Sequence, residues 1–218
     1  MKKTIAVVLL AALMLALPGC TPKNEYTRYA DSFYDTFDTL VQVVAYTKSE
    51  QEFRQYFAII EETFQKLHRL YTIYESYEGL NNLKTINDNA GIAPVEVEQE
   101  IIDLILFAKE WHGRTAGRTN IALGPVLKLW HHYREEGLYD PPNAELPPLE
   151  ALQEAARHTS IDEVIVDTEK NTVFLPDPKM SLDVGAVAKG FAAGLAAQKA
   201  MAAGMESGLI SAGGNVYA

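Results

Sequence analysis

Apolar residues recur along the chain with two periods, one typical of helices and one typical of strands. The longest helical pattern covers residues 52–75, and Ser49 with Glu52 forms a capping box in front of it. Further helices are predicted over 98–112, 124–134, 149–158 and 186–203. Runs of β-branched and aromatic residues predict strands over 36–47, 162–167, 172–175, 209–211 and 215–217. Because helices and strands do not alternate strictly, the pattern predicts an α+β fold, with a mixed or antiparallel sheet packed with helices.

The first twenty residues follow a different pattern. Two lysines precede an apolar run, Ile5–Leu17, that is too short to cross a bilayer comfortably and is typical of a secretory signal peptide. The sequence LPGC that ends this segment resembles the bacterial lipobox, which implies that Cys20 is lipidated, with palmitate among the acyl groups. We therefore expect a signal peptide over 1–19, a lipid-anchored tether over 20–30 and a domain over 31–218. The domain would be anchored to the cell membrane, facing outside the cytoplasm.

Composition narrows the classes of function. The chain has 218 residues, of which 48% are apolar and 22% are charged, and this suits one globular domain with a sizeable core. The 29 acidic residues outnumber the 19 basic ones, which argues against a broad nucleic-acid-binding surface. Cys20 is the only cysteine, so the chain has no pair from which to form an internal disulfide.

The segment 181–194, SLDVGAVAKGFAAG, is the strongest candidate for binding chemistry. Small residues at the start of a predicted helix let backbone N–H groups approach a phosphate, and the helix dipole favours negative charge there. Lys189 would add a positive charge, and Asp183 can accept hydrogen bonds from a ribose or a base. The segment is not a P-loop, because Lys189 precedes Gly190 and Phe191 stands where Ser or Thr would hold magnesium. An N-capped, alanine-rich helix with an exposed lysine explains the same residues, and both interpretations remain open.

Other motifs carry less information. The five histidines show no metal-ligand spacing, and neither G-x-S-x-G nor G-x-G-x-x-G is present. Tyr71, Tyr74 and Tyr77 recur at helical spacing, which indicates core packing. A tyrosine at a helix end can also stack on a flat ligand.

Five segments, taken in order, resemble one family. They are Phe37–Thr39 (FDT), Tyr74 followed by Leu83–Asn87 (LKTIN), Thr119–Trp130 (TNIALGPVLKLW), Ser181–Phe191 (SLDVGAVAKGF) and Ser211–Asn215 (SAGGN). Together they resemble the bacterial FAD:protein FMN transferases of the ApbE type, and the resemblance covers nearly everything after the tether. The combination of DVGAVAKGF with SAGGN is the most specific part.

The resemblance implies an activity and a set of site residues. Such enzymes take FAD and magnesium, cleave the pyrophosphate, attach FMN to a threonine of a partner protein and release AMP. Many are exported lipoproteins, and their acceptors are flavoprotein subunits of membrane redox complexes. The implied FAD-binding residues are Phe37, which borders the flavin where methionine is usual, Tyr74, which stacks on a ring of FAD, and Arg118, Thr119, Asn120, Asp183 and Lys189. The backbone carbonyl of Ala186 would be a metal ligand.

Two departures from the family pattern affect these expectations. Thr119 and Asn120 stand where many members have Phe-Asp. Members also continue past the SAGGN segment with an acidic metal ligand and part of the FAD pocket, so we expect the C-terminal part of the fold to be missing from this sequence, which ends at Ala218. Two alternatives to FMN transfer are an FAD pyrophosphatase and a non-catalytic, lipid-anchored flavin-binding remnant. No residue is assigned as general base.

Overall fold

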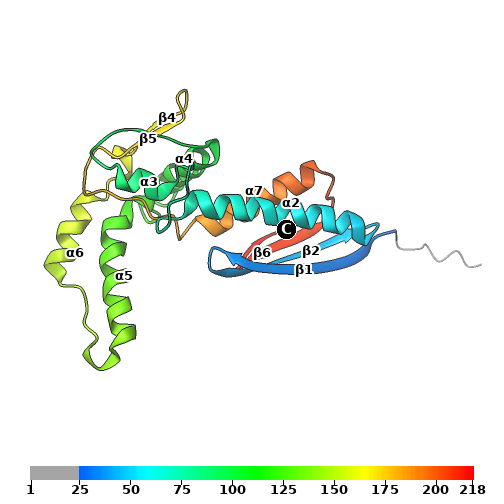
Figure 1. The fold of residues 1–218 in the computed structure, drawn as a ribbon, viewed down its shortest axis with the longest axis horizontal. Helices are drawn as coiled ribbons and strands as arrows, with labels where there is room; N and C mark the ends of the chain where they lie inside the picture. Colours follow the sequence, from blue (N-terminus) through cyan, green and yellow to red (C-terminus); the bar gives the residue numbers. More distant parts are fainter. Residues whose placement is uncertain (1–24) are drawn as a thin grey trace, which may run out of the picture.

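The computed structural model describes residues 25–218, so the predicted signal peptide and Cys20 lie outside the described residues. The described chain has two lobes (Figure 1). The first lobe is built on a four-stranded antiparallel sheet with the order β1-β2-β6-β7. Its strands are β1 (Thr27–Thr36), β2 (Thr39–Thr47), β6 (Gly208–Ala212) and β7 (Asn215–Tyr217).

Strand β1 corrects two expectations from the sequence. The pattern over 36–47 predicts one strand, but the chain reverses at Phe37 and Asp38, which both have positive φ. The segment before this turn pairs antiparallel with β2, and the edge strand that it forms begins at Thr27. The sheet therefore extends into residues 20–30, for which the sequence predicts a tether.

Two helices, α2 (Glu50–Tyr71) and α7 (Ala188–Ala202), cover one face of this sheet (Figure 1). The Ser49 side chain caps α2 by accepting a hydrogen bond from the Glu52 N–H, as the capping box predicts. The apolar side of α2 is buried, and the buried face of α7 consists of alanines, which let the two helices pack closely. The main buried side chains of this layer are Val41, Val43, Phe53, Ile60, Phe64, Leu67, Ala192, Ala196 and Ile210.

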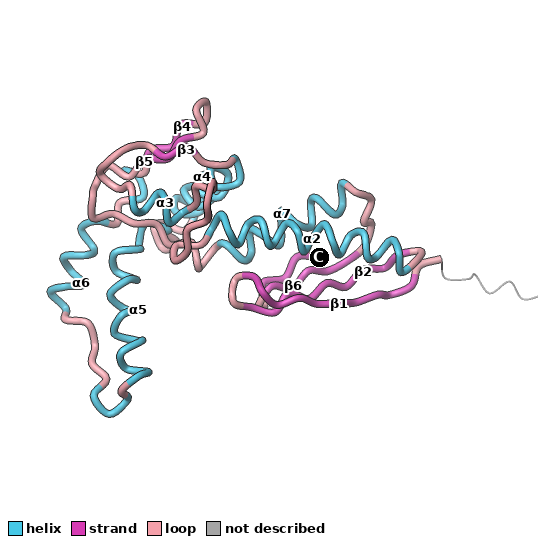
Figure 2. Tube along the Cα trace, viewed as in Figure 1, coloured by secondary structure: helices cyan, strands magenta, loops and turns pink. Residues whose placement is uncertain are grey.

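Residues 72–187, inserted between α2 and α7, form the second lobe (Figure 2). It holds a small antiparallel sheet of order β3-β5-β4. Its helices are α3 (Leu83–Asp88), α4 (Gln99–Arg114), α5 (Gly124–Tyr139) and α6 (Leu149–Ala155), and its strands are β3 (Val95–Glu96), β4 (Ile165–Asp167) and β5 (Thr172–Phe174). Short 3-10 turns lie at Ile121–Leu123, Pro141–Asn143, Ala156–His158 and Ile161–Glu163. One continuous core joins the lobes.

The predicted fold class is confirmed, with differences at element boundaries. Helix α2 ends at Tyr71, and Thr72 already has extended backbone angles, so residues 72–75 leave the predicted helix. Helix α5 runs to Tyr139, beyond the predicted end at 134. Helices α5 and α6 project from the second lobe as an arm (Figure 2). Among the described residues, no helix is both long enough and apolar enough to cross a membrane.

Candidate functional site

The second lobe contains an open groove of about 1080 Å³. Helices α5 and α6 form one part of its lining, and α3 with the segment Pro178–Asp183 forms another. Two residues singled out in the sequence, Tyr74 and Asp183, line this same groove. The groove therefore brings together two of the predicted ligand-binding residues.

The segment that carries Asp183 is fixed by hydrogen bonds from two other elements. The Asn87 side chain at α3 accepts from the Leu182 N–H at 2.7 Å and donates to the Leu182 carbonyl at 2.9 Å. The Asp183 N–H then donates to the Ile121 carbonyl at 2.7 Å. Leu182 is fully buried, so these bonds replace water at backbone groups that the solvent does not reach. Asp183 is thereby held at a defined place in the groove wall.

The first turn of α5 packs directly against the same wall segment. Gly124 begins α5, and a Cβ atom at this position would lie 2.4 Å from both the carbonyl oxygen and the hydroxyl of Ser181. Only glycine fits this contact, because real Cβ atoms do not approach backbone atoms so closely. Pro125 follows at the first helical turn, as the sequence predicts.

The sequence predicts a helix over residues 186–203, and the helix observed there starts two residues later. The Asp183 carboxylate accepts a hydrogen bond from the Gly185 N–H at 2.9 Å, and α7 begins at Ala188. Gly185 and Ala186 are exposed in the intervening turn. Lys189 lies in the first turn of α7, and neither Lys189 nor Ala186 is among the residues that line the groove.

Tyr74 presents its ring to the groove, with 64% of the residue exposed. The ring lies against His131 of α5, with 5.7 Å between ring centroids and a tilt of 32°. Partial desolvation raises the pKa of Tyr74, the Asp183 carboxylate raises it further, and the Arg134 guanidinium acts in the opposite direction. The phenol group therefore lies within the electrostatic influence of both Asp183 and Arg134.

Helix α5 supplies a row of charged groups that the sequence interpretation did not select. Lys128, His131, Arg134 and Glu135 all line the groove. His131 Nε2 lies 3.0 Å from a Glu135 carboxylate oxygen, and Arg134 Nη2 lies 3.2 Å from His131 Nδ1. The available signal was the spacing of Lys128, His131 and Arg134, since residues three apart share a helix face.

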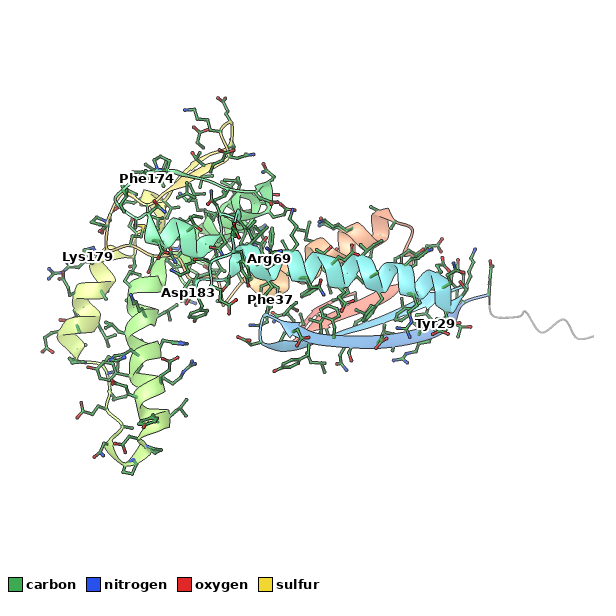
Figure 3. The ribbon with its side chains drawn as sticks, in the orientation of Figure 1. Tyr29, Phe37, Arg69, Phe174, Lys179 and Asp183 are labelled. Atoms are coloured by element: carbon green, nitrogen blue, oxygen red, sulfur yellow. The ribbon has the colours of Figure 1, made fainter. Side chains whose placement is uncertain are left out.

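Five of the seven predicted FAD-binding residues lie outside this groove lining, Lys189 among them. Phe37 lies at the turn between β1 and β2, where the two lobes meet (Figure 3). Its backbone N–H donates to His68 Nδ1 at 3.2 Å, and its ring packs edge-on against Phe64 and His68. The neighbouring Asp38 makes a small contribution to the raised pKa of Tyr74, after burial, Asp183 and Glu135.

Arg118, Thr119 and Asn120 follow α4 and precede α5. The Asn120 side chain accepts from the Ala122 N–H at 2.8 Å and donates to the Thr159 carbonyl at 2.8 Å, so both ends of its amide hold the fold. The Thr119 carbonyl lies 2.8 Å from His112 Nδ1, and Arg118 is exposed. These contacts give Asn120 a structural role in positioning the start of α5.

An ionic cluster connects α6 to the chain that leads into the groove wall. His158 Nδ1 lies 2.5 Å from an Asp177 carboxylate oxygen, and Lys179 Nζ lies 3.0 Å from Glu154. Hydrogen bonding from the Lys179 N–H, followed by the contact with His158, lowers the pKa of Asp177. The sequence placed His158 on a helix and assigned it no partner. Asp177 lies outside that helix and follows two predicted strands, so the helical pattern gives no sign of the contact.

The described residues alone do not form a magnesium site. Within residues 25–218, no three or more His, Cys, Asp or Glu side chains are grouped so that they could hold a metal. The predicted carbonyl ligand, Ala186, lies in the exposed turn before α7. A single carbonyl oxygen is fewer protein ligands than a magnesium site needs.

Comparison with known proteins identifies relatives across most of the chain. A model of the ApbE family matches residues 37–218. The chain is 30% identical over 214 residues to the FAD:protein FMN transferase of Treponema pallidum (strain Nichols), covering 96% of this chain and 56% of the relative. It is 32% identical over 160 residues to the FAD:protein FMN transferase of Klebsiella pneumoniae (strain 342), covering 73% and 48% respectively. The chain thus spans about half the length of these curated relatives.

Solved structures agree with this fold. The ApbE protein of Thermotoga maritima superimposes with a TM-score of 0.69 at 26% identity, over 86% of this chain and 57% of that chain. The flavin transferase ApbE from Vibrio cholerae superimposes with a TM-score of 0.71 at 18% identity, over 87% of this chain and 58% of that chain. At this lower identity, the second likeness concerns the fold alone.

Proposed function

The chain belongs to the ApbE family, and from this premise we propose that the protein transfers FMN from FAD to an acceptor protein. The observation that carries the proposal is that Tyr74 and Asp183, two of the residues expected to bind FAD, line one groove. The curated relatives named FAD:protein FMN transferase support the same reaction class. The groove volume of about 1080 Å³ is in the range that accommodates a large cofactor.

The proposed reaction is phosphoryl transfer. The hydroxyl oxygen of an acceptor threonine attacks the phosphorus of the FMN half of FAD and loses its proton. A new threonine–FMN phosphoester bond forms as the pyrophosphate bond breaks, and AMP leaves with the bridging oxygen. In such reactions the protein mainly positions the reactants and stabilises charge.

The residues of this chain would act by binding and orientation. The exposed ring of Tyr74 offers a face on which a flat ring of FAD can stack. The Asp183 carboxylate, fixed through the neighbouring Leu182 and Ile121, would accept hydrogen bonds from a ribose hydroxyl or a ring N–H. The wall segment 181–183 therefore sets the position of the ligand relative to Tyr74.

The magnesium requirement belongs to the same proposal. FAD would be used together with Mg²⁺, which prefers oxygen ligands and accepts substrate phosphates among them. The resemblance assigns the Ala186 carbonyl to this ion. Removal of the ion with a chelator is therefore expected to stop transfer and to leave stacking on Tyr74 in place.

The partner and the location are also proposed. The acceptor would be a flavoprotein subunit of a membrane redox complex, and lipidated Cys20 would hold the enzyme at the cell membrane, facing outside the cytoplasm. Metabolic labelling with a palmitate analogue tests the anchor, and a Cys20→Ala variant that retains the label would contradict it.

The reaction can be tested with FAD, Mg²⁺ and an acceptor that another ApbE-family enzyme flavinylates. We expect the acceptor mass to rise by one esterified FMN, with one AMP released per transfer. An acceptor with Thr→Val at the modified position is the matched control. AMP release that does not need acceptor would indicate an FAD pyrophosphatase, and FAD binding without AMP release would indicate a flavin-binding protein. Either result refutes the transferase proposal.

A further inference from the structure

The ionic groups that line the groove are unevenly paired. Lys84 lies 2.6 Å from Asp88, and Lys179 lies 3.0 Å from Glu154, so these two cations are already neutralised by neighbours. Two other cations of the lining, Lys128 and Arg134 on α5, form no salt bridge with a carboxylate among residues 25–218. The described part of the groove therefore keeps two positive charges available on one helix.

Arg134 is held beside the aromatic part of the groove. Its Nη2 atom lies 3.2 Å from Nδ1 of His131, whose ring lies against Tyr74 and whose Nε2 atom lies 3.0 Å from Glu135. A guanidinium has five N–H donors, and the contact with His131 uses one end of it. The remaining donors are available to a ligand next to Tyr74.

The opposite charge of the site is Asp183. Tyr74, Arg134 and Asp183 all line this one groove, so a single extended ligand can reach all three. A ring on Tyr74, a hydrogen-bond donor directed at Asp183 and an anionic group directed at Arg134 match the parts of a nucleotide. The planar guanidinium suits phosphate oxygens, which it can bind with two parallel hydrogen bonds.

We propose that Arg134, assisted by Lys128, binds the phosphate groups of the nucleotide whose ring stacks on Tyr74. For the identity of the nucleotide as FAD, this inference rests on the proposed function. It assigns phosphate recognition to α5, whereas the sequence alone directs attention to Lys189 at the start of α7, outside the groove lining. His131 is a positioning residue, because it orients both the Tyr74 ring and the Arg134 guanidinium.

Calorimetric titration of the purified protein with three ligands tests the proposal. FAD and ADP carry a diphosphate, and riboflavin carries the flavin ring without phosphate. Arg134→Gln should weaken the binding of FAD and of ADP by about tenfold each, as expected for the loss of one charge-assisted contact. The affinity for riboflavin should not change. Lys128→Gln should have a smaller effect in the same direction, and Arg134→Lys should recover part of the loss.

Arg28→Gln is the matched control, because Arg28 is an exposed arginine on β1 outside the groove lining. It should bind all three ligands as the parent protein does. Circular dichroism and the melting temperature check that each variant is folded. Raising the ionic strength should weaken FAD binding by the parent protein more than by Arg134→Gln, since screening acts on the charge that the variant has lost.

The outcomes separate this inference from the proposed function. FAD binding that is equal in the parent and Arg134→Gln proteins overturns the inference and leaves the transferase proposal standing. Equal loss of FAD and riboflavin also overturns it, since that pattern indicates a structural role. If ADP binds in a way that depends on Arg134 but FAD does not bind, the phosphate-binding role of Arg134 is supported and the identification of the nucleotide as FAD is overturned. Binding of neither ligand by the parent protein overturns both.

Discussion

Replacement of Asn87 by alanine should loosen the groove wall and destabilise the protein. The Asn87 side chain makes the hydrogen bonds at 2.7 and 2.9 Å that satisfy both backbone groups of Leu182. The alanine variant would leave this N–H and this carbonyl without partners. Because the Leu182 side chain is fully buried, relaxation of the wall to admit water would also disturb core packing.

The expected size follows from the number of groups left unpaired. One unsatisfied buried polar group costs about 1–3 kcal/mol, and two are affected here. Asn87 itself is only partly buried, so water replaces some of the lost hydrogen bonding. We therefore expect the free energy of unfolding to fall by about 2–3 kcal/mol.

Asn81→Ala is the matched control. Asn81 is exposed, and its side chain donates one hydrogen bond, to the Glu96 carbonyl at 2.8 Å. The free energy of unfolding of Asn81→Ala should fall by about 1 kcal/mol or less. Urea unfolding compares the two variants, and hydrogen exchange at the Leu182 amide should accelerate only in Asn87→Ala. Equal stabilities, or an unchanged exchange rate at Leu182, would refute the reasoning.

Three further predictions follow from the site. Gly124→Ala should lower the free energy of unfolding by about 3 kcal/mol, because the added Cβ would overlap the Ser181 carbonyl. Gly113→Ala is the control and should not destabilise α4, because the space at its Cβ is open. Thermal melting of the two variants measures the difference. Since the pKa of Asp177 is lowered in the folded state, its pairing stabilises the protein above its unfolded pKa and is lost as pH falls through the folded pKa. Asp177→Asn should therefore lower the free energy of unfolding by about 1 kcal/mol at pH 7 and by progressively less below pH 4. Urea unfolding at each pH measures this difference. A difference that stays constant with pH would contradict the prediction. Tyr74→Ala should weaken FAD binding by about tenfold and Tyr74→Phe by much less, and equal losses in a fluorescence titration would show that the hydroxyl rather than the ring is required.

The sequence predicted the elements whose pattern is strong. Helix α2 has a long apolar period and a capping box, and its start agrees with the structure within two residues. Strand β1 was missed because its apolar residues are sparse. Tyr29 stacks on Phe53, and Phe33 packs on Phe57 and Phe64, so tertiary contacts rather than local pattern define this edge strand.

The site was predictable only in part. Asp183 was selected from the pattern of the segment 181–194 and then by resemblance, and Tyr74 was assigned a ligand by resemblance. The structure places both residues in the lining of one groove. Arg134 was not identified, because on a helix surface it has the pattern of an ordinary solvated charge. Its distinguishing feature is the absence of a carboxylate neighbour within the described residues, a property of three-dimensional packing. Asn87 likewise gains its role from Leu182, which lies far along the chain and is joined to it only in the folded state.

The insertion of the second lobe has a consequence for how the family can diversify. Residues 72–187 leave the first lobe after Tyr71 and return before Phe191, and these two rings lie with centroids 6.5 Å apart. A flexible loop within a segment whose ends already meet can lengthen at little cost, since doubling the length of such a loop costs only about 0.6 kcal/mol in chain entropy. Pairs such as Val43 and Ile210 in the sheet are untouched by such changes. Natural variation and protein engineering can therefore reshape the groove and its ligand preference while the strand pairing of the first lobe stays the same.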